Sequence, residues 1–155
     1  MYELWTDGSH RKSGCGGWAF AIVKNGKVLE CKHGSADDST NNRMEMVPVI
    51  QGLKRFDKSA AQVTVYSDSA YVINCFVQKW YIKWRKQNWV GAANKPVSNR
   101  DLWEALLEVV EGFPEGNIKW VHVRGHQGIG KNDYVDSLAA MESAALEKRK
   151  QEVRK

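Results

Sequence analysis

The chain has 155 residues, a formal net charge of +5 at pH 7 and three cysteines. This length predicts one domain with a sizeable core, and the positive charge is compatible with a polyanionic partner but does not establish one. The cysteines, Cys15, Cys31 and Cys75, form no C-x-x-C pair, which argues against a disulfide framework or a zinc ribbon. Because the sequence shows no signal-peptide pattern and no long apolar run, we expect a cytoplasmic protein that does not cross a membrane.

The first part of the sequence predicts an antiparallel meander of three strands, over residues 2–6, 18–23 and about 27–33. The first strand should end at Asp7, and the glycine-rich residues 13–17 then let the backbone turn. Asn25 and Gly26 are a two-residue hairpin signal, which predicts that the third strand returns antiparallel to the second.

A helix over about residues 42–56 is predicted from one apolar face, formed by Met46, Val49, Ile50, Leu53 and Phe56. Glu45 lies at the start of this helix and points toward the edge of the core, where a carboxylate needs a hydrogen bond, a cation or a metal. The alternative is an acid that only favours the helix dipole from the first turn. Pro48 lacks an N–H, so we expect a bend there or a later helix start.

A β-branched strand over residues 63–67 and a helix over about residues 70–77 follow, joined by Asp68 and Ser69. The order strand, helix, strand predicts that this strand runs parallel to the first. Ligands of such sheets bind beyond the carboxyl ends of the strands. We therefore expect Asp7 and Asp68 to lie close together.

The segment between Asp68 and Asp101 has no acidic residue. It interleaves cations and aromatic rings, namely Lys79, Lys83, Arg85, Lys86, Lys95 and Arg100 with Trp80, Tyr81, Trp84 and Trp89. This composition is typical of a nucleic-acid grip in which cations contact phosphates and rings lie against sugar or base. Trp80 and Trp84 are four residues apart, so the alternative is that they pack on each other.

The remaining sequence predicts a helix from residues 99–101 to about Val110, a strand over residues 118–122 and a glycine-rich loop over residues 125–130. Asn132 or Asp133 should cap a last helix that carries Asp136 in its first turn. We expect one domain over residues 1–146, with a basic handle at about residues 79–100, and a basic C-terminal tail over residues 147–155 that forms a solvated helix end.

Four carboxylates, those of Asp7, Glu45, Asp68 and Asp136, thus come from two strand ends and two helix starts. Four like charges in a small volume require compensation. Mg²⁺ binds through a few carboxylates together with waters and phosphates, and two ions about 4 Å apart can drive phosphodiester cleavage.

In order and spacing, five segments resemble type 1 ribonuclease H of the bacterial kind: Thr6 to Ser9, Thr40 to Glu45, Ser67 to Ser69, Gly125-His126 and residues 132–136. The resemblance implies an α/β ribonuclease H-like fold, with a mixed five-stranded sheet flanked by helices. In that sheet the first three strands are antiparallel, and the fourth and fifth are parallel to the first.

The resemblance also implies endonucleolytic hydrolysis of the RNA strand of RNA/DNA hybrids by a two-metal-ion mechanism, leaving 5′-phosphate and 3′-hydroxyl ends. Two Mg²⁺ ions, with Mn²⁺ as a possible substitute, would be held by Asp7, Glu45, Asp68 and Asp136. His126 would assist proton transfer or product release, whereas without the resemblance it would be a solvated loop histidine. We expect the protein to act as a monomer.

The same resemblance implies a set of nucleic-acid contacts: Gly8, Ser9, Thr40, Asn41, Asn42, Asn132 and, in the handle, Trp80, Lys83, Trp84, Arg85 and Lys86. Hydroxyl and amide groups can bond to the 2′-hydroxyls that distinguish RNA from DNA. Without the resemblance, Asn41 and Asn42 would be assigned as helix caps.

The sequence departs from the family pattern at three places: the shortened glycine loop that contains Ser13 and Cys15, Ala70 where a glutamine is common, and Pro48. Rival interpretations are a resolvase, integrase or reverse-transcriptase domain of the same superfamily, and a non-catalytic hybrid-binding module. A small-molecule oxidoreductase is disfavoured because the glycine-rich segment is not a G-x-G-x-x-G motif between a strand and a helix.

Overall fold

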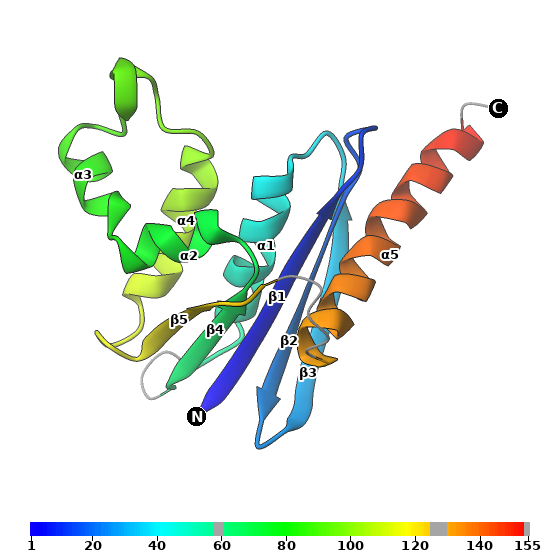
Figure 1. Ribbon diagram of the computed structural model, residues 1–155, viewed down its shortest axis with the longest axis horizontal. Coiled ribbons are helices and arrows are strands. Elements are labelled where there is room, and N and C mark those ends of the chain that lie inside the picture. The colour runs from blue at the N-terminus through cyan, green and yellow to red at the C-terminus, as the bar shows by residue number, and fades with distance from the viewer. Residues whose placement is uncertain (58–60, 125–129, 154–155) are drawn as a thin grey trace.

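The computed structural model describes residues 1–57, 61–124 and 130–153 (Figure 1). A five-stranded sheet has the order β3-β2-β1-β4-β5. Its strands are β1 (Tyr2–His10), β2 (Gly16–Lys24), β3 (Lys27–Ala36), β4 (Val63–Ser67) and β5 (Ile118–His122). The first three strands pair antiparallel, β4 pairs parallel with β1 and β5 pairs parallel with β4, which confirms the predicted fold class.

The helices of the described residues are α1 (Asn41–Leu53), α2 (Ala70–Val77), α3 (Trp80–Lys86), the 3-10 helix η1 (Ala92–Asn94), α4 (Arg100–Glu111) and α5 (Gly130–Val153). Figure 1 shows α1, α2 and α4 on one face of the sheet and α5 on the other, with α3 and η1 projecting at the edge. None of these helices combines the length and the apolar composition that a membrane crossing requires.

Each face of the sheet carries its own core because successive strand residues point to opposite sides. Leu4 belongs to the larger cluster, beneath α1, α2 and α4. The next residue, Trp5, belongs to a smaller cluster that contains Val135 and Ala139 of α5. The close approach of α5 depends on Gly17 of β2, where a Cβ would overlap the backbone of Ala139 and Ser143. The two cores hold α1 and α5 against opposite faces of β1.

The first strand is longer than predicted, so Asp7 lies inside β1 and not at its end. Pairing with β4 stops at Trp5 opposite Tyr66, but pairing with β2 continues, with Asp7 opposite Ala19. The glycine-rich segment supplies this extra length because Gly16 and Gly17 are themselves strand residues. Asp7 is therefore held by β2 while it projects beyond the last parallel pair with β4.

The start of α1 is predicted to within one residue, whereas the predicted cap of the last helix is wrong. Pro48 does not delay α1, which begins at Asn41 and contains the buried Pro48. Its N-cap is Thr40, whose side chain accepts a hydrogen bond from the Arg43 N–H at 3.3 Å, so neither Asn41 nor Asn42 caps the helix. α1 ends at Leu53, earlier than predicted. Because α5 begins at Gly130, Asn132 lies within the helix and Asp136 is in its second turn.

Candidate metal centre

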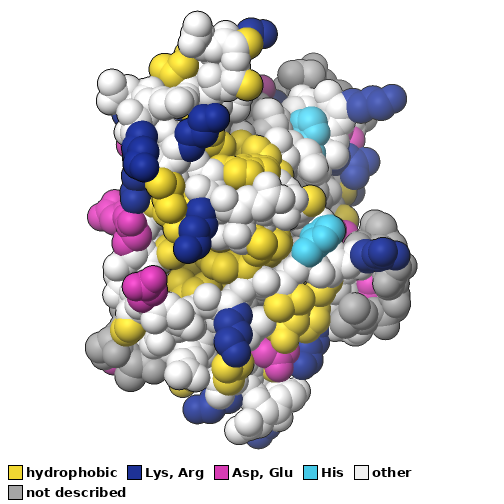
Figure 2. Space-filling view, turned by 60° about the vertical axis from the view of Figure 1, so that its left-hand side comes forward, with side chains coloured by type: hydrophobic (Ala, Val, Ile, Leu, Met, Phe, Trp, Pro, Cys, Tyr) yellow, Lys and Arg dark blue, Asp and Glu magenta, His cyan; other side chains and the backbone are white. Residues whose placement is uncertain are grey.

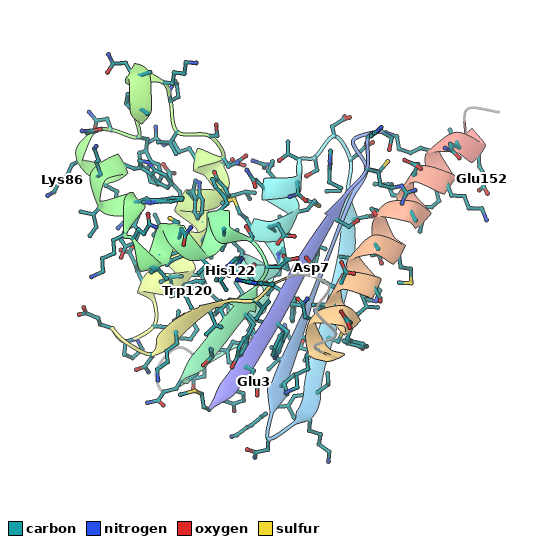
Figure 3. The ribbon with its side chains drawn as sticks, in the orientation of Figure 1. Glu3, Asp7, Lys86, Trp120, His122 and Glu152 are labelled. Carbon is teal, nitrogen blue, oxygen red and sulfur yellow. The ribbon has the colours of Figure 1, made fainter. Side chains whose placement is uncertain are left out.

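Three acidic side chains converge at one end of the sheet, as predicted. Asp7, Glu45 and Asp68 each offer an oxygen within 4.8 Å of the others. Asp7 comes from β1, Glu45 from the first turns of α1 and Asp68 from the residue after β4. Figure 3 shows Asp7 on β1 beside the carboxyl-terminal ends of β4 and β5.

The fourth predicted carboxylate, Asp136, lines the same cleft. This cleft has a volume of about 410 Å³ and is bordered by Asp7, Gly8, Asn41, Asn42, Glu45, Asp68, Ser69, Ala70, Tyr71 and Asp136. The structure thus brings all four predicted carboxylates together, although they come from segments 129 residues apart at the extremes, Asp7 and Asp136. The orientation of α5 on the second face of the sheet makes this possible.

Gly8 places Glu45 beside Asp7. The Gly8 N–H donates to Oε1 of Glu45 at 2.7 Å and to Oδ1 of Asp7 at 2.9 Å. A Cβ on Gly8 would overlap the Met44 backbone and lie 2.7 Å from the Glu45 nitrogen. The absence of a side chain at Gly8 therefore lets the start of α1 rest directly on β1.

Both carboxylates are buried and only partly hydrogen-bonded. Asp7 is 2% exposed and Glu45 is 5% exposed. Within the described part of the chain, Oδ2 of Asp7 and Oε2 of Glu45 have no hydrogen-bond partner. A buried, unpartnered carboxylate oxygen is costly, and a divalent cation supplies the missing partner. The donor set of acidic oxygens fits Mg²⁺ or Mn²⁺ and does not resemble a sulfur or imidazole site.

The raised pKa values of Asp7 and Glu45 also favour a cation site. Burial is the largest of the effects that raise the pKa of Asp7 to about 8, and the neighbouring carboxyls of Asp136 and Asp68 also raise it. The pKa of Glu45 is also raised well above its usual range, first by burial and then by Asp68 and Asp7. Without cations, the charged forms of these groups are disfavoured because they are desolvated and repel each other.

Two residues that the sequence did not single out support the site. Nε2 of His122 lies 3.0 Å from the main-chain oxygen of Asp68, and its partner in the sheet is Ser67. Tyr71 lines the cleft, and its hydroxyl accepts hydrogen bonds from Trp103 at 2.9 Å and Asn99 at 3.3 Å. The sequence signal for His122 was its place at the end of a predicted strand. Tyr71 had none, because its partners come from α4.

The predicted nucleic-acid contacts outside the handle differ in where their side chains lie. Gly8, Asn41 and Asn42 line the cleft, whereas Thr40 caps α1. The Ser9 hydroxyl is 2.9 Å from the Ser143 hydroxyl and so faces α5. Asn132 is 2% exposed, and its Oδ1 has no partner within the described residues. This burial gives no support to the predicted contact of Asn132 with a nucleic acid. His126 lies outside the described residues.

In the handle, Trp80 and Trp84 pack on each other, which was the alternative interpretation of their spacing. Their ring centroids are 6.0 Å apart, and Trp84 also lies 6.0 Å from Trp89 and 5.5 Å from Trp103. Both rings are partly buried against the main core. Trp80 and Trp84 therefore serve the packing of the handle first.

The cations of the handle are not equivalent. Arg85 makes two hydrogen bonds of 2.7 Å to the carboxylate of Glu111. Lys83 and Lys86 are exposed and have no acidic partner among the described residues. Figure 3 shows Lys86 pointing away from the body of the protein, and Figure 2 shows lysine and arginine side chains spread around hydrophobic ones on this side.

Sequence comparison with known proteins finds similarity to one family. The model of the RNase H family matches residues 1–144. The ribonuclease H of Thermoanaerobacter sp. (strain X514) is 41% identical over 140 residues, which are 90% of this chain and 87% of that protein. The ribonuclease H of Hydrogenovibrio crunogenus is 44% identical over 138 residues, which are 88% of this chain and 91% of that protein.

Solved structures share the fold at lower sequence identity. The foamy viral protease-reverse transcriptase in complex with an RNA/DNA hybrid has a TM-score of 0.79 at 20% identity, over 92% of this chain and 20% of that chain. LC9-RNase H1, a type 1 RNase H with the type 2 active-site motif, has a TM-score of 0.74 at 23% identity, over 93% of this chain and 72% of that chain.

Proposed function

Since the chain belongs to the ribonuclease H family, it is a ribonuclease H enzyme, and we propose that it hydrolyses the RNA strand of RNA/DNA hybrids endonucleolytically with two divalent metal ions. The products would be 5′-phosphate and 3′-hydroxyl ends. The observation that carries this proposal is the convergence of Asp7, Glu45, Asp68 and Asp136 on one cleft, with buried carboxylate oxygens that lack partners among the described residues.

Two Mg²⁺ ions, or Mn²⁺ in their place, would be held by these four carboxylates. The chemistry that such ions supply is activation of a water and stabilisation of the leaving oxygen. The protein's part is to keep the donor oxygens in place. Gly8 orients Asp7 and Glu45 through its N–H, and the turn at Asp68 is fixed by the Ser67 hydroxyl, which accepts from the Ser69 N–H at 3.1 Å.

The hybrid would be recognised beside this cluster. Asn41 and Asn42 border the cleft and offer amide donors and acceptors for ribose 2′-hydroxyls and base edges. Lys83 and Lys86 would contact phosphates without regard to sequence. The foamy viral structure that shares the fold contains an RNA/DNA hybrid, which supports this substrate. His126 would assist proton transfer or product release, and we propose no contact for Asn132.

We further propose a monomer in the cytoplasm. The cleft is built from residues of a single chain. Cys15, Cys31 and Cys75 are free thiols, which fits a reducing compartment.

The decisive experiment is cleavage of an RNA/DNA hybrid labelled separately on each strand, with Mg²⁺ and with EDTA. We expect cuts only in the RNA strand, only with metal, and product ends that carry 5′-phosphate and 3′-hydroxyl groups. Duplex DNA and branched DNA serve as parallel substrates. Preferential cleavage of branched DNA would favour a resolvase-type activity, and hybrid binding without any metal-dependent cleavage would leave only a binding module.

A further inference from the structure

The last turns of α5 extend beyond the part of the chain that the family model matches. That match ends at residue 144, whereas α5 continues to Val153. The extension contains two inward-facing charged residues, Glu147 and Lys150, which we call the C-terminal clamp. Both contact loops that adjoin β1 or α1, the elements that carry the cleft residues Gly8, Asn41 and Asn42.

Glu147 holds the turn between β1 and β2. Its Oε1 lies 3.1 Å from Nε of Arg11, and its Oε2 accepts a hydrogen bond from the Ser13 hydroxyl at 2.5 Å. The turn is closed by its own backbone, since the Arg11 N–H donates to the Cys15 oxygen at 3.0 Å and the Gly14 N–H donates to the Arg11 oxygen at 2.9 Å. One carboxylate thus joins two side chains of a single compact turn to α5.

Lys150, one turn further along α5, holds the loop before α1. Its Nζ lies 2.6 Å from Oδ1 of Asp37. The two loops also touch each other, because the Ser39 N–H donates to the Gly14 oxygen at 2.9 Å. The clamp, the β1–β2 turn and the loop before α1 therefore form one connected set of polar contacts.

The two clamped loops adjoin the elements that carry the proposed RNA contacts. One follows β1, which contains Gly8, and the other precedes Thr40, the cap of α1, and the cleft residues Asn41 and Asn42. Since the clamp residues touch neither the carboxylates nor the cleft, they would act through the loops. We propose that Glu147 and Lys150 are positioning residues that preorganise the two loops beside the hybrid-binding residues, an inference that rests on the proposed function.

A preorganised loop binds with a smaller loss of conformational freedom, so the clamp should appear in KM and not in kcat. The opposite arrangement is that Glu147 competes with a substrate phosphate for Arg11. The two differ in sign: loss of the clamp raises KM if it positions the loops and lowers KM if it competes with the hybrid.

The test uses the full chain carrying Glu147→Gln and Lys150→Gln together, which leaves the net charge unchanged. The matched control carries Lys148→Gln and Glu152→Gln, which alter the same helix at exposed residues without ion pairs among the described residues. Figure 3 shows Glu152 near the end of α5. Because exposed ion pairs are individually weak, we expect KM for the hybrid to rise about three- to tenfold in the clamp variant, with kcat within about twofold of wild type. The control should match wild type.

Amide hydrogen exchange provides a readout independent of cleavage. Residues 11–14 and 37–39 should exchange faster in the clamp variant, while β1, β4 and the thermal midpoint are unchanged because the two cores are intact. Wild-type KM together with wild-type exchange, or a lowered KM, would overturn the positioning role. A wild-type chain that cuts no hybrid at all would instead refute the proposed function, and the inference with it.

Discussion

Asp7 and Glu45 share one hydrogen-bond donor, the N–H of Gly8, at 2.9 and 2.7 Å. Two buried carboxylates on different elements are thereby held side by side despite their mutual repulsion. Each uses one oxygen for this bond, and the second oxygen of each has no partner within the described chain. Both residues line the same cleft, so a shared cation there could supply the missing partner of each.

Gly8→Ala tests this relationship through geometry alone. The new Cβ would overlap the Met44 backbone, so the start of α1 must move away from β1 and Glu45 must move with it. We expect a loss of about 1–3 kcal/mol in the free energy of unfolding from overpacking, together with a large loss of cleavage. Urea unfolding and hybrid cleavage measure the two effects.

The control is Gly130→Ala, because a Cβ at Gly130 would have no atom of the described residues within 4 Å. Its stability should stay within about 0.5 kcal/mol of wild type. Unimpaired cleavage by the Gly8→Ala variant would show that the close contact between β1 and α1 is not needed to place Glu45.

Asp7→Asn should reduce the cleavage rate by about 10³-fold or more. Divalent ions supply several kcal/mol of transition-state stabilisation, and each 1.36 kcal/mol is tenfold in rate. Hybrid affinity measured in EDTA should change little, since the phosphate contacts are elsewhere. Asp133→Asn, in the first turn of α5, removes the same charge outside the cluster and serves as the control. Wild-type turnover by Asp7→Asn with Mg²⁺ would remove Asp7 from the metal site.

The raised pKa of Asp7 predicts a pH dependence of stability in the absence of metal. The pKa is about 8 in the folded chain against an ordinary value of 3.8. Between these values the folded state binds more protons than the unfolded chain. The stability contributed by Asp7 is therefore fully present below the ordinary pKa and is lost as the pH rises through the folded pKa.

Denaturation in EDTA from about pH 5 to about pH 9 should show a shallower decline for Asp7→Asn than for wild type. Comparing the two chains cancels the titration of most other groups. Because Glu45 also has a raised pKa, some decline should persist in the variant. Added Mg²⁺ should flatten the wild-type curve, since it compensates the charged carboxylates. Identical curves for the two chains would mean that Asp7 titrates normally.

The carboxylate cluster could be predicted from the sequence because strand ends and helix starts have regular geometry. Asp68 follows a β-branched strand, and Glu45 lies on the inner side of an apolar helix. The role of Gly8 could not be predicted, because it depends on how closely α1 approaches β1. The same limit explains the errors in the helix caps, because a cap such as Thr40 depends on a local hydrogen bond that several neighbouring residues could make.

Ion pairs between distant segments could not be predicted from the sequence either. Arg43 forms a bidentate pair with Asp101, at 2.9 and 2.8 Å, across 58 positions. Arg85 of α3 pairs with Glu111 of α4, and Lys79, which joins α2 to α3, has a positive φ of 57°. A basic segment therefore overstates the number of cations available to a nucleic acid.

This difference among cations gives a prediction for the handle. Lys83 and Lys86 are exposed and have no acidic partner among the described residues, whereas Arg85 is held by Glu111. Each phosphate contact contributes about 0.9 to the slope of log affinity against log salt on a duplex. Replacing Lys83 and Lys86 with alanine should therefore make the slope shallower by up to about twice that amount. Arg85→Ala should change the slope less.

Lys27→Ala provides the control, because Lys27 is an exposed lysine in the hairpin between β2 and β3, far from the handle in Figure 1. It removes one positive charge, as each lysine replacement in the handle does, and should leave the slope unchanged. Affinity is measured in EDTA over a salt series, so that cleavage does not interfere. If Arg85→Ala reduces the slope by half as much as the double lysine variant does, the ion pair between Arg85 and Glu111 must open when the hybrid binds. If the double lysine variant leaves the slope unchanged, the phosphate contacts lie outside the handle, and Lys95 and Arg100 are the next residues to replace.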